Sequence, residues 1–352
     1  MPVDIEKAKR VWPPTCHGRW MSEEYEPGLV SVIIPTYNRA HFLGEAMDSV
    51  WAQTYRPIEM LVVDDGSTDN TPQVLEDWGK RHSEDPQFEL RYFHQENKGA
   101  PAARNLGLIE SSGEFIQFLD ADDFLLPDKL RQAVETIERS QVDFAYAEVA
   151  VSDDRLNLVP GERYGKPLRG HAKDVTAYTW PIMGPVYRRS VNREAGPWDE
   201  ELAASQDWEY AARIKLLEYA CCFDKRVGAL FRQHGGARLG GMALRQRLNA
   251  WEKATDRVVN AATSLHKLDW QLRDCLSRLY FTQAVTKGRN GSLMEGDRCL
   301  YKAWKLSPPV SLIGLAARLL QGCRSTWICV VVDAVLTARC KLLSKLRQWR
   351  RA

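Results

Sequence analysis

Residues 120–123 read Asp-Ala-Asp-Asp and directly follow the apolar run Phe115–Leu119, which is typical of a buried strand. Adjacent carboxylates repel one another unless a cation or solvent takes up their charge. A hard divalent ion such as Mg²⁺ or Mn²⁺ is the natural partner, and it completes its coordination shell with water and phosphate oxygens of a substrate. The alternative is an acidic loop that faces water and caps the helix expected near Asp128.

Two more polar clusters follow apolar runs of strand type. Residues 36–39 (Thr-Tyr-Asn-Arg) come after Val30–Pro35, and residues 64–69 (Asp-Asp-Gly-Ser-Thr-Asp) come after Ile58–Val63. Ligands of open α/β sheets bind beyond the carboxyl ends of the strands, so these clusters mark one candidate site. Asp65 beside a flexible glycine could hydrogen-bond a base edge or a ribose, although ordinary turn chemistry is an equal alternative. Arg104, in the first turns of the next expected helix, could brace a phosphate or could simply be exposed.

The elements that must position these residues alternate between strand and helix. The pattern predicts a mainly parallel sheet, with some antiparallel pairing, flanked by helices. The further expected strands are 90–93, 115–119, 144–151 and 227–231, and the expected helices are 39–52, 71–82, 100–110, 128–140 and 207–219. Residues 152–180 are expected to be rich in loops, and residues 242–305 to be helical.

Four ordered segments resemble the motifs of family 2 glycosyltransferases of the GT-A type: 32–39, 63–69, 97–105 and 119–123. The resemblance implies transfer of a sugar, with inversion, from a nucleotide-diphosphate sugar, with a UDP-sugar expected. It implies that Asp65 contacts the base and Asp120 the ribose, and that Mn²⁺ or Mg²⁺ is held by Asp122 and Asp123. The full nucleotide-sugar-binding set expected from it is Pro35, Thr36, Tyr37, Arg39, Asp65, Lys98, Gly99, Arg104, Asp120, Ala121 and Arg232.

The resemblance continues more loosely to about residue 235, through segments 183–190, 196–200 and 205–210. The acidic pair that the family carries before a helix is here Gln206-Asp207, so the second acid is kept. Asp207 is therefore the candidate general base, because a carboxylate within reach can take the proton of an attacking hydroxyl. An N-cap role is the alternative for Asp207. Glu209 is the reserve candidate for the base, and Asp199 and Glu200 are more distant reserves.

Residues 231–236 resemble a segment of the family that closes over the diphosphate. Arg232 is expected to clamp phosphate, and His234 to complete the metal shell, since neutral imidazole is a common metal ligand. A hydrogen-bonded structural histidine is the alternative for His234.

The expected organisation is a lead-in at 1–28, a GT-A-type domain at 29–240, a helical appendage at 241–306 and an amphipathic basic tail at 307–352. The GT-A-type domain divides into a nucleotide-sugar half, 29–125, and an acceptor half, 126–240. Residues 298–352 carry 11 of the 48 Lys and Arg but one of the 46 Asp and Glu, so this end is strongly basic whereas the rest of the chain is acidic. A peripheral membrane contact is expected for the tail, with packing on protein as the alternative.

Composition and the absence of certain motifs disfavour several other classes of protein. The chain has 352 residues and eight cysteines without zinc-like spacing, and its first residues lack the apolar core of a signal peptide, which favours the cytoplasm and the inner face of the cell membrane. No GxGxxG follows the first strand and no GxxxxGK[ST] occurs, which disfavours dehydrogenases and P-loop enzymes. The expected partners are a nucleotide-sugar donor and a glycan or lipid-linked acceptor, and no nucleic acid. A nucleotidyltransferase and a nucleotide-sugar-binding protein without catalysis remain as alternatives.

Overall fold

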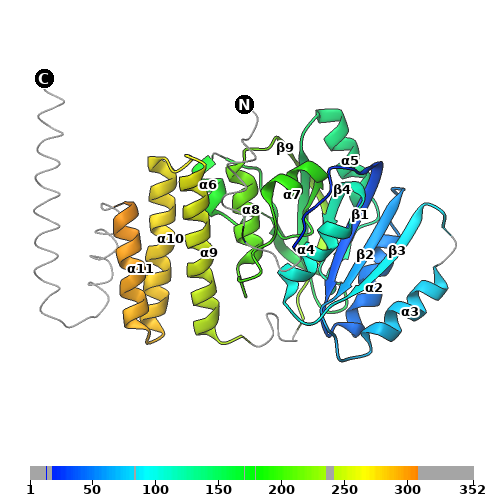
Figure 1. Ribbon diagram of the computed structural model, residues 1–352, viewed down its shortest axis with the longest axis horizontal. Coiled ribbons are helices and arrows are strands. Elements are labelled where there is room, and N and C mark those ends of the chain that lie inside the picture. The colour runs from blue at the N-terminus through cyan, green and yellow to red at the C-terminus, as the bar shows by residue number, and fades with distance from the viewer. Residues whose placement is uncertain are drawn as a thin grey trace, which may run out of the picture. The chain divides into compact units, whose positions relative to one another are not determined.

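The computed structural model describes residues 13, 18–82, 85–169, 171–178, 180–234 and 242–307. These residues divide into two compact units, one that ends at Leu268 and one that begins at Asp269. The first unit holds one sheet of nine strands, in the order β3-β2-β1-β4-β8-β6-β9-β5, with β7 paired to β6. Figure 1 shows β1, β2 and β3 side by side.

The first half of the sheet is parallel, as the alternating pattern predicts. Four strands pair in parallel in the order β3-β2-β1-β4. Strand β1 is buried from Val30 to Ile34, because helices cover the sheet and leave no water-facing side for polar residues. The elements of this half are β1 (Glu26–Thr36), α2 (Ala40–Trp51), β2 (Ile58–Asp64), α3 (Thr71–Arg81), β3 (Phe88–His94), α4 (Ala100–Glu110) and β4 (Gly113–Phe118).

The second half makes the sheet mixed. Strand β8 pairs antiparallel with both β4 and β6, and β9 returns parallel to β6. The elements are β5 (Phe124–Leu125), α5 (Lys129–Ser140), β6 (Phe144–Ser152), β7 (Leu158–Tyr164), α6 (His171–Thr176), β8 (Pro185–Arg188), α7 (Arg189–Ala195), α8 (Gln206–Leu216) and β9 (Cys221–Arg232). The predicted α/β fold, with a mixed sheet flanked by helices, is confirmed, and the parallel pairs are concentrated in the first half.

Several details differ from the expectation. Strands β5 and β8 and helix α7 were not expected. The segment expected to be loops contains β7 and α6, and β9 begins at Cys221, six residues earlier than expected. Strand β7 escapes the pattern because, among the described strands, it pairs with β6 alone and its residues are mostly exposed, so no buried apolar run marks it. The start of β9 escapes because its first residues are only half-buried.

Helices follow the sheet, as expected for residues 242–305. Helix α9 (Leu244–Ser264) packs on α8 within the first unit, although the appendage was expected to begin at residue 241. In the second unit, α10 (Trp270–Arg289) and α11 (Leu293–Leu306) pack against each other (Figure 1). Within the residues described, no helix has the length and apolar character needed to cross a membrane. Apart from Ser307, the expected basic tail lies outside the described residues.

Candidate active site

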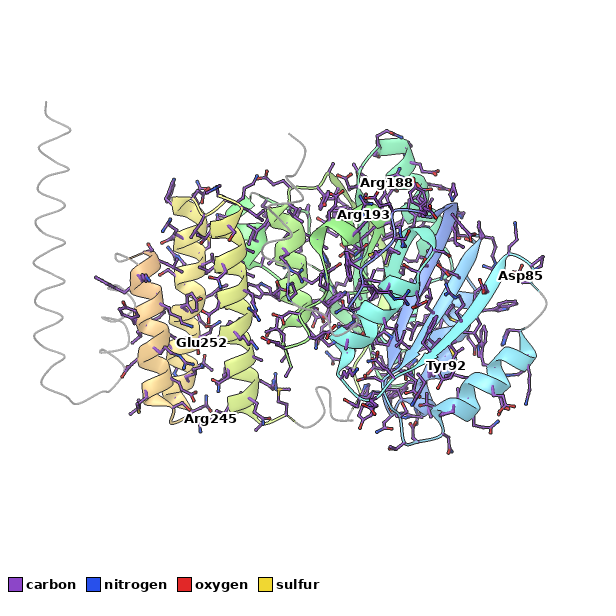
Figure 2. The ribbon with its side chains drawn as sticks, in the orientation of Figure 1. Asp85, Tyr92, Arg188, Arg193, Arg245 and Glu252 are labelled. Atoms are coloured by element: carbon purple, nitrogen blue, oxygen red, sulfur yellow. The ribbon has the colours of Figure 1, made fainter. Side chains whose placement is uncertain are left out.

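The polar clusters gather where the parallel strands end. Strand β1 ends at Thr36, which pairs with Asp64 at the end of β2. Asp64 in turn pairs with His94 at the end of β3. The hydroxyl of Tyr92 donates to Asp64 Oδ2 at 3.3 Å. Figure 2 shows Tyr92 at this end of the sheet, whereas Arg188, at the end of the antiparallel β8, lies at the other. The antiparallel strand thus runs away from the site, and the parallel strands run into it.

The loops after β1 and β2 are joined by hydrogen bonds. The Asn38 N–H donates to Ser67 Oγ at 2.9 Å, and the Thr68 N–H donates to Asn38 Oδ1 at 2.8 Å. Asn38 adopts a φ of 52°, a left-handed conformation that asparagine tolerates better than most residues. Of the expected site residues here, Pro35 and Thr36 are buried at the end of β1, and Tyr37 is left 45% exposed.

Asp65 anchors the loop that leads into α4. Its carboxylate accepts hydrogen bonds from the Lys98 N–H at 2.9 Å, the Gly99 N–H at 2.7 Å and the Gln95 side chain at 2.7 Å. A carboxylate has about four lone-pair sites, so one remains for a ligand such as a base edge. Lys98 thus contributes its backbone, while its side chain is exposed, and Gln95 is a member of this loop that the sequence did not single out.

Gly66 is required by this arrangement, since its φ is +80° and a Cβ would lie 2.9 Å from the backbone nitrogen of Asn97. We expect Gly66→Ala to destabilise the protein by about 1–3 kcal/mol, because it combines a strained backbone with a contact to a loop that cannot move freely. Denaturant unfolding measures the change. Gly44→Ala is the control: it lies in α2 with open space around it, and should be neutral or stabilising by about 0.5–1 kcal/mol. Equal stability of Gly66→Ala and the wild type would contradict the tight loop.

The carboxylates of Asp120, Asp122 and Asp123 come together after β4, each offering an oxygen within 4.8 Å of the others. Asp122 Oδ2 lies 2.9 Å from His234 Nε2 and 3.5 Å from Arg39 Nε. The hard oxygen donors, with an imidazole beside them, fit Mn²⁺ or Mg²⁺. Asp120, Asp122 and Asp123 are therefore brought to one place, and His234, the third expected metal ligand, lies against Asp122. Ala121 is buried within the same turn.

Arg232 is turned into the protein. Its guanidinium donates to Glu45 Oε2 at 2.5 Å and lies over the Phe42 ring at 4.7 Å, and its backbone N–H donates to Asp123 Oδ1 at 2.8 Å. His234, two residues later, packs on the same Phe42 ring at 4.8 Å. Arg232, the last residue of β9 and two residues before His234, therefore holds Asp123, and the phosphate clamp expected of it stays a prediction.

Arg104 links the carboxylate cluster to α8. It is 4% exposed, donates to Asp120 Oδ1 at 2.7 Å and to Gln206 Oε1 at 3.0 Å, and lies 3.4 Å from Asp207 Oδ1. Burial by itself lowers the pKa of Arg104, but the charges of Asp120 and Asp207 outweigh it and raise that pKa, so the guanidinium stays charged. The interpretation of Arg104 as a simply exposed arginine is wrong.

Because Arg104 hydrogen-bonds Asp120 and Gln206 and pairs with the charge of Asp207 from one buried position, we expect Arg104→Lys to lower turnover at least tenfold and to destabilise the protein by about 1–3 kcal/mol. An ammonium cannot reproduce the planar fork of a guanidinium. Steady-state rates and denaturant unfolding measure the two effects. Arg226→Lys is the control, since the side chain of Arg226 is 57% exposed and pairs with Asp224 on the surface. Matching results for the two variants would remove Arg104 from the site.

Asp207 lies in the first turn of α8, whose N-cap is Ser205, so the N-cap alternative for Asp207 is wrong. The Asp207 side chain is 32% exposed. Its surroundings raise the pKa of its carboxyl: partial removal from water has the largest effect, Arg104 opposes it, and Asp120 adds to it. A carboxylate that solvent can reach, with a raised pKa, is a stronger base than an ordinary aspartate. Asp207, the base predicted from the sequence, thus lies beside Arg104, which was predicted to bind phosphate.

The reserve acids are occupied by other residues. Glu209 is buried and makes a two-point ion pair with Arg213 at 2.8 and 2.9 Å. Asp199 is 1% exposed at its side chain and pairs with Arg257 at 2.7 Å. Glu200 accepts from Asn105 at 2.8 Å. Among the four acids considered for the base, Asp207 is thus the one that both contacts Arg104 and is partly exposed to solvent.

Fold and site together define a GT-A-type glycosyltransferase. Residues 31–195 match the family model described as glycosyl transferase family 2. A glycosyltransferase of Nostoc sp., alr2836, is 34% identical over 268 residues, which cover 74% of this chain and 80% of that protein. The chain belongs to glycosyl transferase family 2.

Further similarities extend the comparison. The glycosyltransferase EpsJ of Bacillus subtilis is 31% identical over 211 residues, covering 54% of this chain and 59% of that protein, so the chain spans less than two thirds of that relative. The structure of S. aureus TarS 1–349 in complex with UDP-GlcNAc aligns over 91% of both chains, with a TM-score of 0.62 and 18% identity. That of GalNAc-T7 with UDP, GalNAc and Mn²⁺ covers 65% of this chain and 47% of that chain, with a TM-score of 0.50 and 18% identity. At these identities the structural likeness shows the fold.

Proposed function

We propose that the protein transfers a sugar from a UDP-sugar to a hydroxyl of a glycan or lipid-linked acceptor, with inversion and with a divalent metal ion at residues 120–123. The observation that carries the proposal is Arg104, which joins Asp120 of the carboxylate cluster to Asp207 of the acceptor side. A TarS structure holds UDP-GlcNAc, which supports a UDP-sugar as the donor. The GalNAc-T7 structure holds Mn²⁺ and UDP, which supports a metal at the acidic cluster.

Asp207 takes the proton of the acceptor hydroxyl as the oxygen bonds to the anomeric carbon, while the bond from that carbon to the diphosphate breaks and the nucleoside diphosphate leaves. Arg104 fixes the Asp207 carboxylate and, through Asp120, its distance from the donor site. Asp122, Asp123 and His234 would hold the metal, which supplies positive charge to the leaving diphosphate. Attack from the side opposite to the leaving group inverts the anomeric centre.

The donor set proposed around the strand ends is the one expected from the sequence. Asp65 uses its remaining lone pair for the base, Thr36, Tyr37 and Arg39 line the nucleotide pocket, and the 98–99 backbone borders it. Thr36 Oγ1 is a buried hydroxyl oxygen without a hydrogen-bond partner in the described structure, as a ligand-facing group would be.

The test is to incubate the purified protein with UDP-sugars and Mn²⁺ and to identify the nucleotide product. The proposal predicts free UDP. A nucleotidyltransferase would instead produce pyrophosphate from a nucleoside triphosphate and a sugar phosphate, and finding that activity would overturn the proposal. Gln206 replaces the first acid of the family's pair, which would favour a protein that binds the donor without turnover. This argument is weak, because the amide oxygen of Gln206 accepts a hydrogen bond from Arg104.

We also propose a peripheral membrane contact for residues 307–352 on the cytoplasmic side, carried by their basic and apolar composition. The full chain should sediment with vesicles that contain anionic lipid and should be released by salt. A chain that ends at Lys305 should stay in the supernatant. Equal sedimentation of the two chains would contradict this role of the tail.

A further inference from the structure

Tyr178 lies on a short loop that is held against the helix carrying Asp207. The loop follows α6, and the Trp208 indole N–H donates to the Thr176 carbonyl at 3.2 Å. Two turns further along α8, Lys215 Nζ donates to the Ala177 carbonyl at 3.0 Å. Trp208 is the residue next to Asp207, so the position of the Tyr178 backbone is tied to that of the proposed base.

The Tyr178 ring is backed by other aromatic residues and yet open to solvent. Tyr164 of β7 meets it edge-to-face, with ring centres 6.1 Å apart and planes at 85°. Tyr164 in turn meets Phe231 of β9 at 5.5 Å and 78°. Tyr178 itself is 49% exposed, which is unusual for a ring with such backing. The described structure therefore presents an aromatic surface that is rigidly supported and uncovered.

The surroundings of this ring are acidic. Partial burial, followed by the charges of Asp207 and Asp120, raises the pKa of Tyr178 well above its ordinary value. Tyr164 and Asp123 contribute in the same direction. The hydroxyl is thus a neutral hydrogen-bond donor across the whole physiological range, and it lies close enough to the proposed base and metal site to sense their charges.

An exposed aromatic ring beside carboxylates suits one class of ligand. A lipid chain on this ring would remove the neighbouring carboxylates from water at high cost. A pyranose ring has an apolar face of C–H groups that packs on an aromatic ring and a rim of hydroxyls that carboxylates and a phenol can hydrogen-bond.

We propose that Tyr178, supported by Tyr164, is the platform on which the acceptor sugar stacks so that one of its hydroxyls reaches Asp207. The inference rests on the proposed function and deepens it, because it makes the acceptor a molecule that ends in a pyranose, whatever carries that sugar. Tyr178 is on this account a residue that sets acceptor specificity.

The experiment measures UDP release by the full chain with Mn²⁺ and the UDP-sugar that it hydrolyses fastest. The acceptor probes are methyl glycosides of glucose, galactose, mannose and N-acetylglucosamine, compared with glycerol and decanol. We expect at least one glycoside, and neither alcohol, to accelerate UDP release. Tyr178→Ala should raise the KM for that glycoside about tenfold, equivalent to about 1.4 kcal/mol, whereas Tyr178→Phe, which keeps the ring, should stay within about threefold of the wild type.

The matched control is Tyr25→Ala, because Tyr25 is 50% exposed and lies just before β1, at the end of that strand opposite to the site. An unchanged glycoside KM in Tyr178→Ala would overturn the inference. Acceleration of UDP release by decanol or glycerol equal to that by the glycosides would overturn it as well. So would hydrolysis of the UDP-sugar that no glycoside accelerates. Absence of UDP release from every UDP-sugar would instead remove the proposed function, and the inference with it. Thermal unfolding of each variant shows whether an effect comes from misfolding.

Discussion

Replacing Asp207 by asparagine should lower kcat by about 10²–10⁴-fold while the protein still binds its donor, because asparagine keeps the shape of the side chain but cannot accept a proton. The Arg104 guanidinium is held by its own hydrogen bond to Asp120, which the substitution leaves in place, so the geometry around Asp120 should persist. The measurement is the rate of UDP release together with the affinity for UDP by calorimetry.

Glu201→Gln is the control for this variant. Glu201 is a neighbouring acid whose side chain is 51% exposed and pairs with Lys253 at 2.8 Å, away from Arg104. It should retain wild-type kcat. If Asp207→Asn turned over normally, Asp207 would lose the role of base; if Asp207→Asn also failed to bind UDP, its effect would be structural rather than chemical.

The second large effect is expected at the metal site. Asp122→Ala should weaken the binding of UDP in the presence of Mn²⁺ at least about 100-fold, because Asp122 stands between His234 and Arg39 and its loss removes a proposed ligand of the ion. The same variant should bind UDP no more weakly than the wild type does when a chelator is present. Calorimetric titrations with Mn²⁺ and with EDTA measure both values.

Asp128→Ala is the matched control, since Asp128 follows the same loop but pairs with Arg131 at 2.9 Å on the surface. It should keep the metal dependence of the wild type. Equal affinity of Asp122→Ala and the wild type for UDP with Mn²⁺ would show that Asp122 does not hold the ion. A loss that persists with EDTA would indicate that the variant disturbs the loop itself.

The parallel half of the fold could be predicted from the sequence because its signals are local. Strands β1, β2 and β4 are short apolar runs that polar residues follow, and β1, β2 and β3 are each followed by a helix. The placement of Thr36, Asp65 and Asp120 at neighbouring strand ends then follows from the parallel arrangement alone. No knowledge of side-chain contacts was needed to bring these three together.

The second half could be predicted less well because its order depends on distant contacts. Strand β8 has only four residues, and nothing in its sequence says that it inserts between β4 and β6. Strand β7 pairs with β6 alone and is mostly exposed, so it lacks the apolar run that marks a buried strand.

The same limit applies to the side chains around the site. Arg104 and Gln206 are 102 residues apart, and Glu45 and Arg232 are 187 residues apart. Glu45 looked like an ordinary helix residue, and Tyr178 an ordinary loop residue. Nothing in the local sequence marks Arg104 as buried, so the sequence could not tell which distant carboxylates lie against it.

Calorimetric titration of the wild-type protein with UDP, GDP, ADP and CDP, each with Mn²⁺ and each with EDTA, tests the central claim most directly. The account predicts that UDP binds, that it binds more tightly than the other nucleotides, and that EDTA weakens its binding at least tenfold. Binding of none of the four nucleotides, or binding of UDP with the same affinity in Mn²⁺ and EDTA, would contradict a metal-dependent nucleotide-sugar site at residues 120–123.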